Sequence, residues 1–534
     1  DLENISILDF DLNNDENHYL EFENFDGGTN PVLYDRTNNL RMIPILENGV
    51  YKVFLPQIQN GAAKRNLILA STTTANALIQ VNSFTQRQFT NYSDPAIAAD
   101  YIILTHPRLM ENFNGESQVE RYRAYRASEA GGSYTPLVVD VNELYDQFAY
   151  GIQQTPLAIR FFVNYIVDQY AAGNWNIKPE LLFLLGKSIR YNSCTNNPTN
   201  FNDNLVPTYG TNGSDILLSA RDISTFQYQL GTGRVSAKTP EEVSRYLDKI
   251  TEYEQVLNTN HPCTVEDRQW LKEVLHIAAG NFPQEEESFT SFLDDYKEIV
   301  EMGQFGGKVV ASVSTGDNAV AIAPVEEYIN NGLNHITYVG HSNGQFWQYG
   351  LEAPENYDNE GKSLFVISSA CFVGDIHKPF PNNDNIIMAE RFTLAEKGSV
   401  GFMAAVKFGF PAFLDNFTSE LHENFTNELY GEPFVLSMRN TTDVIFNGDS
   451  EFIIGDQLTS EEMVFCGDPA LELYHFDRPE YILTEENIVF DPPFISAGID
   501  SVELSVKVFN MGKAVEDSMD ISIQQTFPDG FIGP

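Results

Sequence analysis

Two residues that can act together as a nucleophile and its base, His341 and Cys371, each stand at the end of an apolar run. The runs are "HITYVGH" (335–341) and "LFVISSAC" (364–371). Ligands bind beyond the carboxyl ends of strands in an open parallel sheet, so neighbouring strands ending this way would bring imidazole and thiol to one crevice. A thiolate beside an imidazolium is a strong nucleophile at neutral pH. A buried cysteine and a packing histidine are the alternative, because cysteine is among the most buried residue types.

A second motif overlaps the first. "GHSNG" (340–344) matches G-x-S-x-G, the nucleophile elbow of α/β-hydrolases, and would make Ser342 the nucleophile. A strand precedes the motif, as that fold requires. The helix that should follow is poorly encoded, because "QFWQYGLEAPENYDNEG" contains Gly, Pro and Asn throughout. A serine hydrolase is therefore the least favoured enzyme hypothesis.

Other polar runs have simpler interpretations. "QEEES" (284–288) is typical of a solvated surface, and "DFDLNNDEN" (9–17) of an acidic loop, because it lacks the glycine and final Glu of an EF-hand. Asp375 follows Gly374, an arrangement common in turns, and we expect it to support the loop after Cys371 rather than to bind substrate. The sequence contains no HExxH, CxxC, P-loop or dinucleotide motif, and the metal sites are unknown.

The elements that would position these residues alternate between strand and helix. Continuous apolar runs such as "DYIILTHP" and "ELLFLLG" suit strands buried on both faces. Thr239, Pro240 and Glu242 form a capping box at the start of a helix with apolar residues at helical spacing. Strand, helix, strand implies a parallel sheet.

Changes in this pattern divide the chain into four parts. Residues 1–97 read as a β-rich N-terminal domain, with short strands between Asn- and Gly-rich turns. Residues 98–230 and 231–475 read as two α/β subdomains of one catalytic region. Residues 476–534 alternate as in the start of an immunoglobulin-like β domain, with too few strands to complete it.

Charge narrows the choice of partners. The chain carries a net charge of −43, from 75 acidic and 32 basic residues. Nucleic acid is excluded as a partner, because its phosphates require a basic surface. Such acidity fits a salty or extracellular setting and is compatible with bound cations. No apolar stretch of about 18 or more residues occurs, so we expect no membrane-spanning helix.

Two motifs together resemble a known family. "YVGHSNGQFW" (338–347), followed by "SACFVGD" (369–375), resembles the gingipain family of cysteine peptidases. "GTGRVSAKTPEEVSRYLDKITEYE" (231–254) and "FCGDPALELY" (465–474) are similar to further family segments, so the likeness covers about 98–475. The β-rich start and the tail "VFNMGKAVEDS" resemble the PorU-like sortase branch of type IX secretion. The resemblance implies a caspase-like three-layer α/β/α region followed by an immunoglobulin-like domain.

The resemblance also implies roles for individual residues. Cys371 would be the nucleophile and His341 the general acid/base, with the backbone N–H groups of Cys371 and Ser342 as the oxyanion hole, although the family usually has glycine at position 342. The family places a Glu behind the histidine; here Asn281 stands nearest to the matching position. No cofactor is needed for the chemistry, and structural calcium, found in several relatives, is compatible with the acidity. The remaining residues of the active-site loops would be Gly340, Gly344, Trp347, Gly374 and Asp375.

From these features we expect a cysteine endopeptidase that works through a thioester. The favoured hypothesis is a sortase-like enzyme at the extracellular or outer-membrane surface that removes C-terminal sorting signals from exported proteins. Its partners would be those substrates, outer-membrane components of the secretion system, and a surface glycolipid as acceptor in a transpeptidase reaction. The alternatives are a secreted gingipain-like endopeptidase and a non-catalytic secretion or adhesion scaffold.

Overall fold

The computed structural model describes all 534 residues except positions 1, 4, 60–61, 74–85, 225–226, 259–263, 266, 315–321, 349–350, 352, 380–385, 448–452, 494–500, 517, 527–529 and 534. The chain divides into two compact units, Asp1–Gln88 and Phe89–Pro534. The first unit ends at Gln88, whereas the predicted N-terminal domain extends to residue 97.

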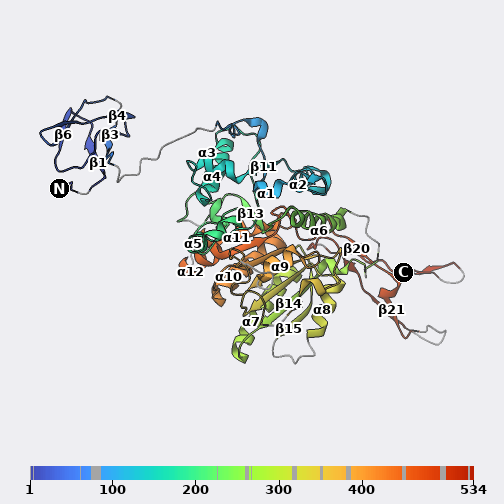
Figure 1. Cartoon of the computed structure of the whole chain (residues 1–534). Coiled ribbons are helices and arrows are strands. Elements are labelled where there is room, and N and C mark those ends of the chain that lie inside the picture. The colour runs from blue at the N-terminus through green and yellow to red at the C-terminus, as the bar shows by residue number, and fades with distance from the viewer. Residues whose placement is uncertain are drawn as a thin grey trace. The chain divides into compact units, whose positions relative to one another are not determined.

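The N-terminal unit, blue in Figure 1, consists of β-strands, as predicted. Two antiparallel sheets, with strand orders β1-β7-β3-β4 and β2-β6-β5, share one apolar core. The acidic run at 9–17 is a loop only in its second part: its first residues belong to β1, where Asp9 and Asp11 both accept hydrogen bonds from Asn66, and residues 14–17 connect β1 to β2. The strands are β1 (Ile7–Asn13), β2 (His18–Phe22), β3 (Val32–Asp35), β4 (Leu40–Met42), β5 (Ile45–Glu47), β6 (Val50–Leu55) and β7 (Lys64–Ala70).

One ten-stranded sheet organises the second unit. Its strand order is β11-β8-β12-β13-β19-β18-β17-β16-β14-β15. The strands are β8 (Tyr101–Thr105), β11 (Pro136–Asp140), β12 (Leu181–Leu185), β13 (Gly231–Val235), β14 (Glu273–Ala279), β15 (Lys308–Ser314), β16 (His335–Gly340), β17 (Leu364–Ser369), β18 (Ser399–Ala405) and β19 (Met463–Cys466).

This sheet has two parallel halves that run in opposite directions. In the first half, β11, β8, β12, β13 and β19 are parallel, and in the second half β18, β17, β16, β14 and β15 are parallel. The halves meet at the antiparallel pair β18–β19. The strands of the two halves therefore point their carboxyl ends in opposite directions.

Local sequence signals account for the elements. β8 and β12 are buried along their whole length, as expected for apolar runs covered on both faces. The capping box is present at the start of α6 (Pro240–Asn258): the Glu242 N–H donates to Thr239 Oγ1 (3.3 Å) and the Thr239 N–H to Glu242 Oε2 (3.2 Å).

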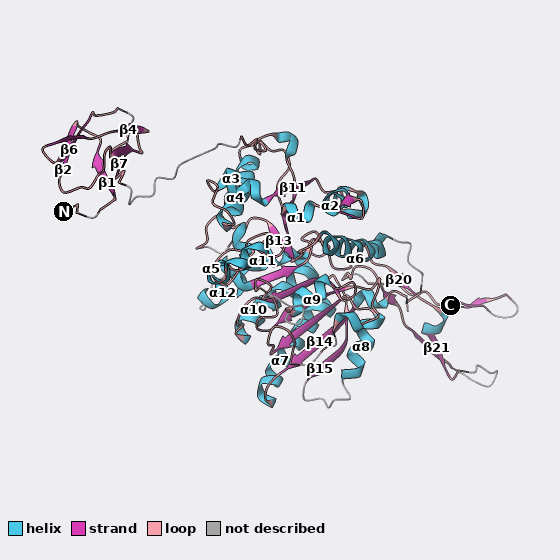
Figure 2. Ribbon diagram, viewed as in Figure 1, coloured by secondary structure: helices cyan, strands magenta, loops and turns pink. Residues whose placement is uncertain are grey.

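Helices cover both faces of each half, which confirms the predicted α/β fold with a three-layer catalytic region (Figure 2). In the first half, α3 and α4 pack on one face and α2 and α6 on the other. In the second half, α8 and α9 oppose α7 and α10. Besides α6, the main helices are α2 (Gln118–Ala127), α3 (Val141–Phe148), α4 (Pro156–Ala171), α7 (Pro283–Met302), α8 (Ile322–Asn331), α9 (Met388–Leu394), α10 (Pro411–Glu423), α11 (Phe434–Asn447) and α12 (Ile453–Glu462).

The predicted division at residue 230 and the predicted tail domain from residue 476 can be compared with the structure. The division at residue 230 falls between β12 and β13, which are hydrogen-bonded neighbours, so both predicted subdomains share one sheet. The described part of the tail forms three separate antiparallel pairs, and an immunoglobulin-like sandwich stays a prediction there. These pairs are β20 (Tyr481–Ile482) with β23 (Phe509–Asn510), β21 (Ile488–Asp491) with β22 (Glu503–Val506), and β24 (Gln525–Thr526) with β25 (Ile532–Gly533).

Candidate active site

His341 and Cys371 follow neighbouring parallel strands at the carboxyl end of the second half of the sheet. The last paired residues of the neighbouring parallel strands β16 and β17 are Val339 and Ser369. His341 and Cys371 each follow two residues later. Because adjacent strands are about 4.8 Å apart, this register places the backbones of the two residues next to each other. Both residues are half-buried, so they remain accessible from solvent.

A carboxylate holds the imidazole. His341 Nε2 lies 3.0 Å from Glu285 Oε2, in the first turn of α7. The Asn281 N–H donates to the same carboxylate oxygen at 2.8 Å. Burial alone would raise the pKa of Glu285, but the Asn281 amide and the His341 imidazole outweigh it, and the net shift is downward. Glu285 is thus held as an anion that can orient His341 and stabilise its protonated form.

This arrangement changes the expected partner of His341. The sequence predicts Asn281 as the residue that orients the imidazole and the run 284–288 as solvated surface. In the structure Glu285, from that run, contacts the imidazole, and the Asn281 backbone positions Glu285. β14 and β16 are neighbours in the sheet, so the turn that follows β14 lies beside the end of β16.

Hydrogen bonds and a stacked aromatic pair hold the loop after β16 in place. The Tyr338 hydroxyl (2.7 Å) and the Gln348 N–H (2.9 Å) both donate to the His341 carbonyl. The buried Trp347 ring stacks on Tyr338 at 4.2 Å and donates to Ser368 Oγ. Trp347 therefore supports the loop from inside the core, together with Ser368, which is fully buried three residues before Cys371.

The turn after β17 presents the thiol. Phe372, directly after Cys371, has φ +63°, a left-handed conformation that is costly for a bulky residue and recurs at functional sites. Its N–H donates to the Lys407 carbonyl (2.9 Å), which holds this turn against the loop after β18. The Gly409 N–H, on that loop, points at Cys371 Sγ (3.4 Å).

Two backbone donors remain available next to the thiol. Among the described residues, no protein acceptor receives the N–H of Ser342 or of Cys371. The Ser342 hydroxyl is itself engaged, because it donates to the Phe346 carbonyl (2.9 Å) and accepts from the Gly344 N–H (2.8 Å). Gly344, with φ +92°, adopts a conformation that favours glycine. Ser342 therefore shapes the loop through its side chain and leaves its N–H free, which does not favour a serine nucleophile.

Asp375 anchors the far side of the turn. It is fully buried and forms ion pairs with Arg190 and with Lys378 (2.6 Å). A side chain at Gly374 would meet the Ala404 carbonyl at 2.7 Å, so the turn packs directly against β18. Asp375 thus supports the loop, and it does so through ion pairs with two cations.

The other cysteines, and the histidines at 106 and 377, show no sign of a catalytic role. Cys194 and Cys466 are buried; burial raises the pKa of Cys194 to about 11 and holds that of Cys466 well above its usual range. Cys263 lies outside the described residues. His377, close to Cys371 in sequence, is buried against Ser188, and burial lowers its pKa to about 3. His106 caps the short helix α1 (Pro107–Met110).

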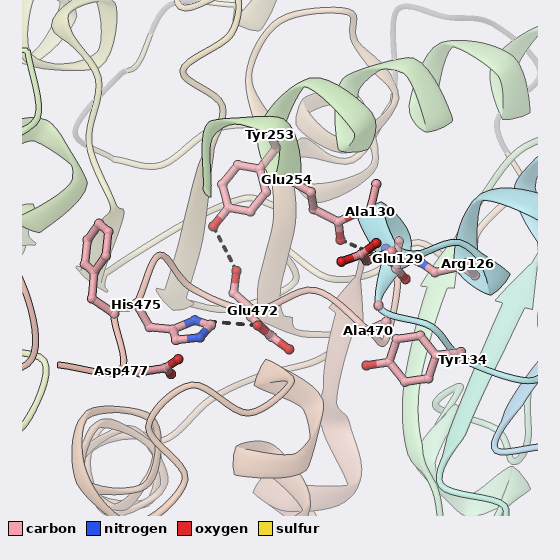
Figure 3. Close-up of a pocket in the computed structure, with 13 residues that line it drawn as sticks. Arg126, Glu129, Ala130, Tyr134, Tyr253, Glu254, Ala470, Glu472, His475 and Asp477 are labelled. Carbon is pink, nitrogen blue, oxygen red and sulfur yellow. Dashed lines mark hydrogen bonds and ion pairs between the residues drawn. The ribbon is translucent and has the colours of Figure 1, made fainter. Parts of the chain in front are cut away.

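A separate acidic cavity of about 390 Å³ lies elsewhere in the same unit (Figure 3). Glu254 from α6 and Glu472 and His475 from beyond β19 line it. Residues that precede β11, such as Gly131 and Tyr134, complete the lining, and neither His341 nor Cys371 belongs to it. Burial, followed by repulsion from Glu254, raises the pKa of Glu472 to about 7.

Only one group of described side chains is close enough together to hold a metal ion: the largely exposed Asp15, Glu16 and His18 in the N-terminal unit. The expected calcium thus stays a prediction. Among the described residues, no helix is both long and apolar enough to cross a membrane.

Proteins of known structure include proteases with a similar fold. A protease of solved structure shares 15% identity with a TM-score of 0.54, over 72% of this chain and 81% of that one. The crystal structure of the Arg-specific cysteine proteinase gingipain R (RgpB) shares 16% with a TM-score of 0.50, over 75% and 83%. Latent dimeric PorU from Porphyromonas gingivalis shares 15% with a TM-score of 0.33, over 50% and 27%. No curated protein sequence matches.

The first two of these likenesses support the α/β fold, and the sequence match assigns the family. The model of peptidase family C25 matches residues 94–474, which include β14, β16 and β17 and the loops that follow them. Because this match covers well over half of the sequence, the chain belongs to peptidase family C25, the gingipain family of cysteine peptidases.

Proposed function

We propose that the chain cleaves peptide bonds with Cys371 as nucleophile and His341 as general acid/base. The observation that carries this proposal is the register of β16 and β17, which sets His341 beside Cys371 while Glu285 holds the imidazole. Such an acid–base–thiol arrangement suits nucleophilic acyl transfer.

The steps follow from these groups. His341 takes the thiol proton, and Sγ of Cys371 attacks the carbonyl carbon of the scissile bond. The negative charge that forms on the carbonyl oxygen is stabilised by the N–H groups of Cys371 and Ser342. His341 then protonates the leaving amine, and a thioester remains on Cys371. Water, deprotonated by His341, attacks the thioester and releases the acid and the free thiol.

The test compares two candidate nucleophiles. Iodoacetamide should label Cys371 much faster than Cys194 and Cys466, because only an accessible thiolate reacts quickly. Ser342→Ala should keep substantial peptidase activity, because its N–H is retained. Equal labelling of the three cysteines in the native protein, read by mass spectrometry, or loss of turnover in Ser342→Ala with labelling unchanged, would sink the proposal.

We further propose a role at the cell surface, removing C-terminal signals from exported proteins. Support comes from the PorU-like sequence features at both ends of the chain and from the net charge of −43, which suits a salty exterior. Transfer to an amine needs a bound acceptor, because bulk water is about 55 M. We therefore expect this chain alone to hydrolyse a model cargo. Efficient capture of an added amine or glycan, seen by mass spectrometry, would instead indicate a built-in acceptor site.

A further inference from the structure

Exposed phenylalanines gather where the site is built. The loops after β14, β16 and β18 carry Phe282, Phe346, Phe408 and Phe410, whose side chains are 52–69% exposed. The turn after β17 adds the half-buried Phe372, whose ring lies 4.5 Å from that of Phe408. Because these four strands are consecutive in the sheet, their carboxyl ends place the five residues along one edge, which we name the phenylalanine rim.

Two members of the rim lie next to the thiol. Phe408 and Phe410 flank Gly409, whose N–H is 3.4 Å and whose carbonyl oxygen is 3.8 Å from Cys371 Sγ. The ring of Phe408 packs edge-on against Phe372, the residue after Cys371. A peptide carbonyl that reaches the thiol must therefore bring its neighbouring side chains close to these two rings.

The charges around these rings do not suit a basic side chain. Lys378 Nζ lies 5.5 Å from the centre of the Phe372 ring, and Lys407 holds the Phe372 N–H through its carbonyl. Nearby Asp375 is already paired with Arg190 and Lys378. Burial, followed by repulsion from Glu461, raises the pKa of the other neighbouring carboxyl, Glu462, to about 7, so part of it is neutral at pH 7.

Exposing a phenylalanine side chain to water is unfavourable, and covering it with a partner lowers the free energy. A substrate side chain is the partner that the position offers, because the rim continues directly into the proposed catalytic pair. We propose that Phe408, Phe410 and Phe372 form a subsite for a large apolar side chain, aromatic or branched aliphatic, next to the scissile bond. This inference rests on the proposed peptidase function and adds the class of substrate.

The experiment uses four fluorogenic peptides, acetyl-Ala-Ala-X-aminomethylcoumarin, with X as Phe, Leu, Arg or Glu. The variants are Phe408→Ala with Phe410→Ala, and as a matched control Phe161→Ala, which removes a phenylalanine of similar exposure from α4. Thermal melting and the rate of Cys371 labelling by iodoacetamide check that each variant keeps its fold and its thiol.

We expect kcat/KM for the Phe and Leu peptides to exceed that for Arg and Glu by roughly tenfold or more, as pockets for apolar side chains provide. The double variant should lose most of that preference, and Phe161→Ala none. Best cleavage of the Arg peptide by the unaltered chain, or an equal loss for all four peptides in the double variant, would overturn the inference and leave the peptidase proposal standing.

A binding experiment tests the proposed subsite independently of the proposed peptidase function. Binding of the four matching peptide amides to Cys371→Ala is measured by calorimetry, with and without the two Phe→Ala changes. If the unaltered chain cleaves no peptide, the proposed function fails, and this arm decides the inference alone. Tighter binding of the Phe and Leu amides that disappears in the double variant supports the subsite; equal binding of all four contradicts it.

Discussion

The two halves of the sheet use similar ionic pairs in opposite ways. Near the first half, Arg126 is paired with Asp468, and both side chains are at most 1% exposed. At the edge of the second half, His341 is paired with Glu285, with 38% and 19% exposure. A buried pair is enclosed by its own hydrogen bonds and serves the fold, whereas a half-exposed pair leaves its groups within reach of a substrate.

The surroundings explain this difference. Asp468 accepts hydrogen bonds from the hydroxyls of Tyr101 and Tyr122, from Arg126 and from the Ala470 N–H, so its oxygens are fully used. Beside Cys371, by contrast, the N–H groups of Ser342 and Cys371 have no protein acceptor among the described residues. Complete satisfaction of polar groups indicates a structural role, and donors left available around a nucleophile indicate a reaction site.

The largest effect should come from removing the thiol. Cys371→Ala should lower kcat/KM by at least about 10⁴-fold, because no other group can form the thioester. The melting temperature should stay nearly unchanged, since Cys371 is only half-buried. Cys466→Ala, in the buried strand β19, should show the reverse: normal activity per folded molecule and a stability loss of about 1 kcal/mol. Peptide hydrolysis and calorimetric melting measure the two; retained activity in Cys371→Ala would break the comparison.

Breaking the buried pair should cost stability instead of chemistry. Asp468→Ala leaves Arg126 and two tyrosine hydroxyls buried without their acceptor, and should lower the free energy of unfolding by about 3–5 kcal/mol. Urea unfolding followed by near-UV circular dichroism measures this loss. A change below about 1 kcal/mol would show that the network contributes little, contrary to its burial.

Removing the charge behind the histidine should have an intermediate effect on catalysis. Glu285→Gln keeps the size of the side chain but no longer stabilises the imidazolium, and we expect kcat to fall about 10- to 100-fold. The pH profile of kcat should shift with it, which a purely structural role would not cause. Glu287→Gln, at an exposed position two residues along α7, is the control; an equal loss in both variants would rule out a specific role for Glu285.

The smallest effect concerns the acidic cavity. Glu472 has a pKa of about 7 in the folded chain against 4.5 when unfolded, so the folded state binds more protons within this window. The free energy of unfolding that the protonated Glu472 carboxyl contributes is thus lost as pH rises from about 4.5 to 7. Glu472→Gln should match the unaltered protein near pH 4.5 and exceed its stability by about 1 kcal/mol at pH 8, allowing for screening of a side chain that is 32% exposed.

Melting curves at the two pH values measure this difference. Glu485→Gln, at an exposed position, should change neither value. A stabilisation by Glu472→Gln that is the same at both pH values would show that it does not arise from deprotonation of this carboxyl.

Much of the site could be predicted because its signals are local. Apolar runs buried on both faces place His341 and Cys371 at strand ends, and the capping box of Thr239 and Glu242 starts α6 where the sequence indicates. Each of these signals depends on residues only a few positions apart. Hydrophobic periodicity and capping act at that range, so they can be recognised without knowing the rest of the fold.

Glu285 could not be found in this way. In sequence it belongs to a run of acidic residues that looks solvated, and only the adjacency of β14 and β16 brings it to the imidazole. The reversal of strand direction at β18–β19 is likewise decided by tertiary structure. The sequence alone thus determined the main strands, the helix starts and the position of His341 and Cys371 at strand ends. The order of strands depends on packing between distant segments, so only the tertiary structure decided which residues meet.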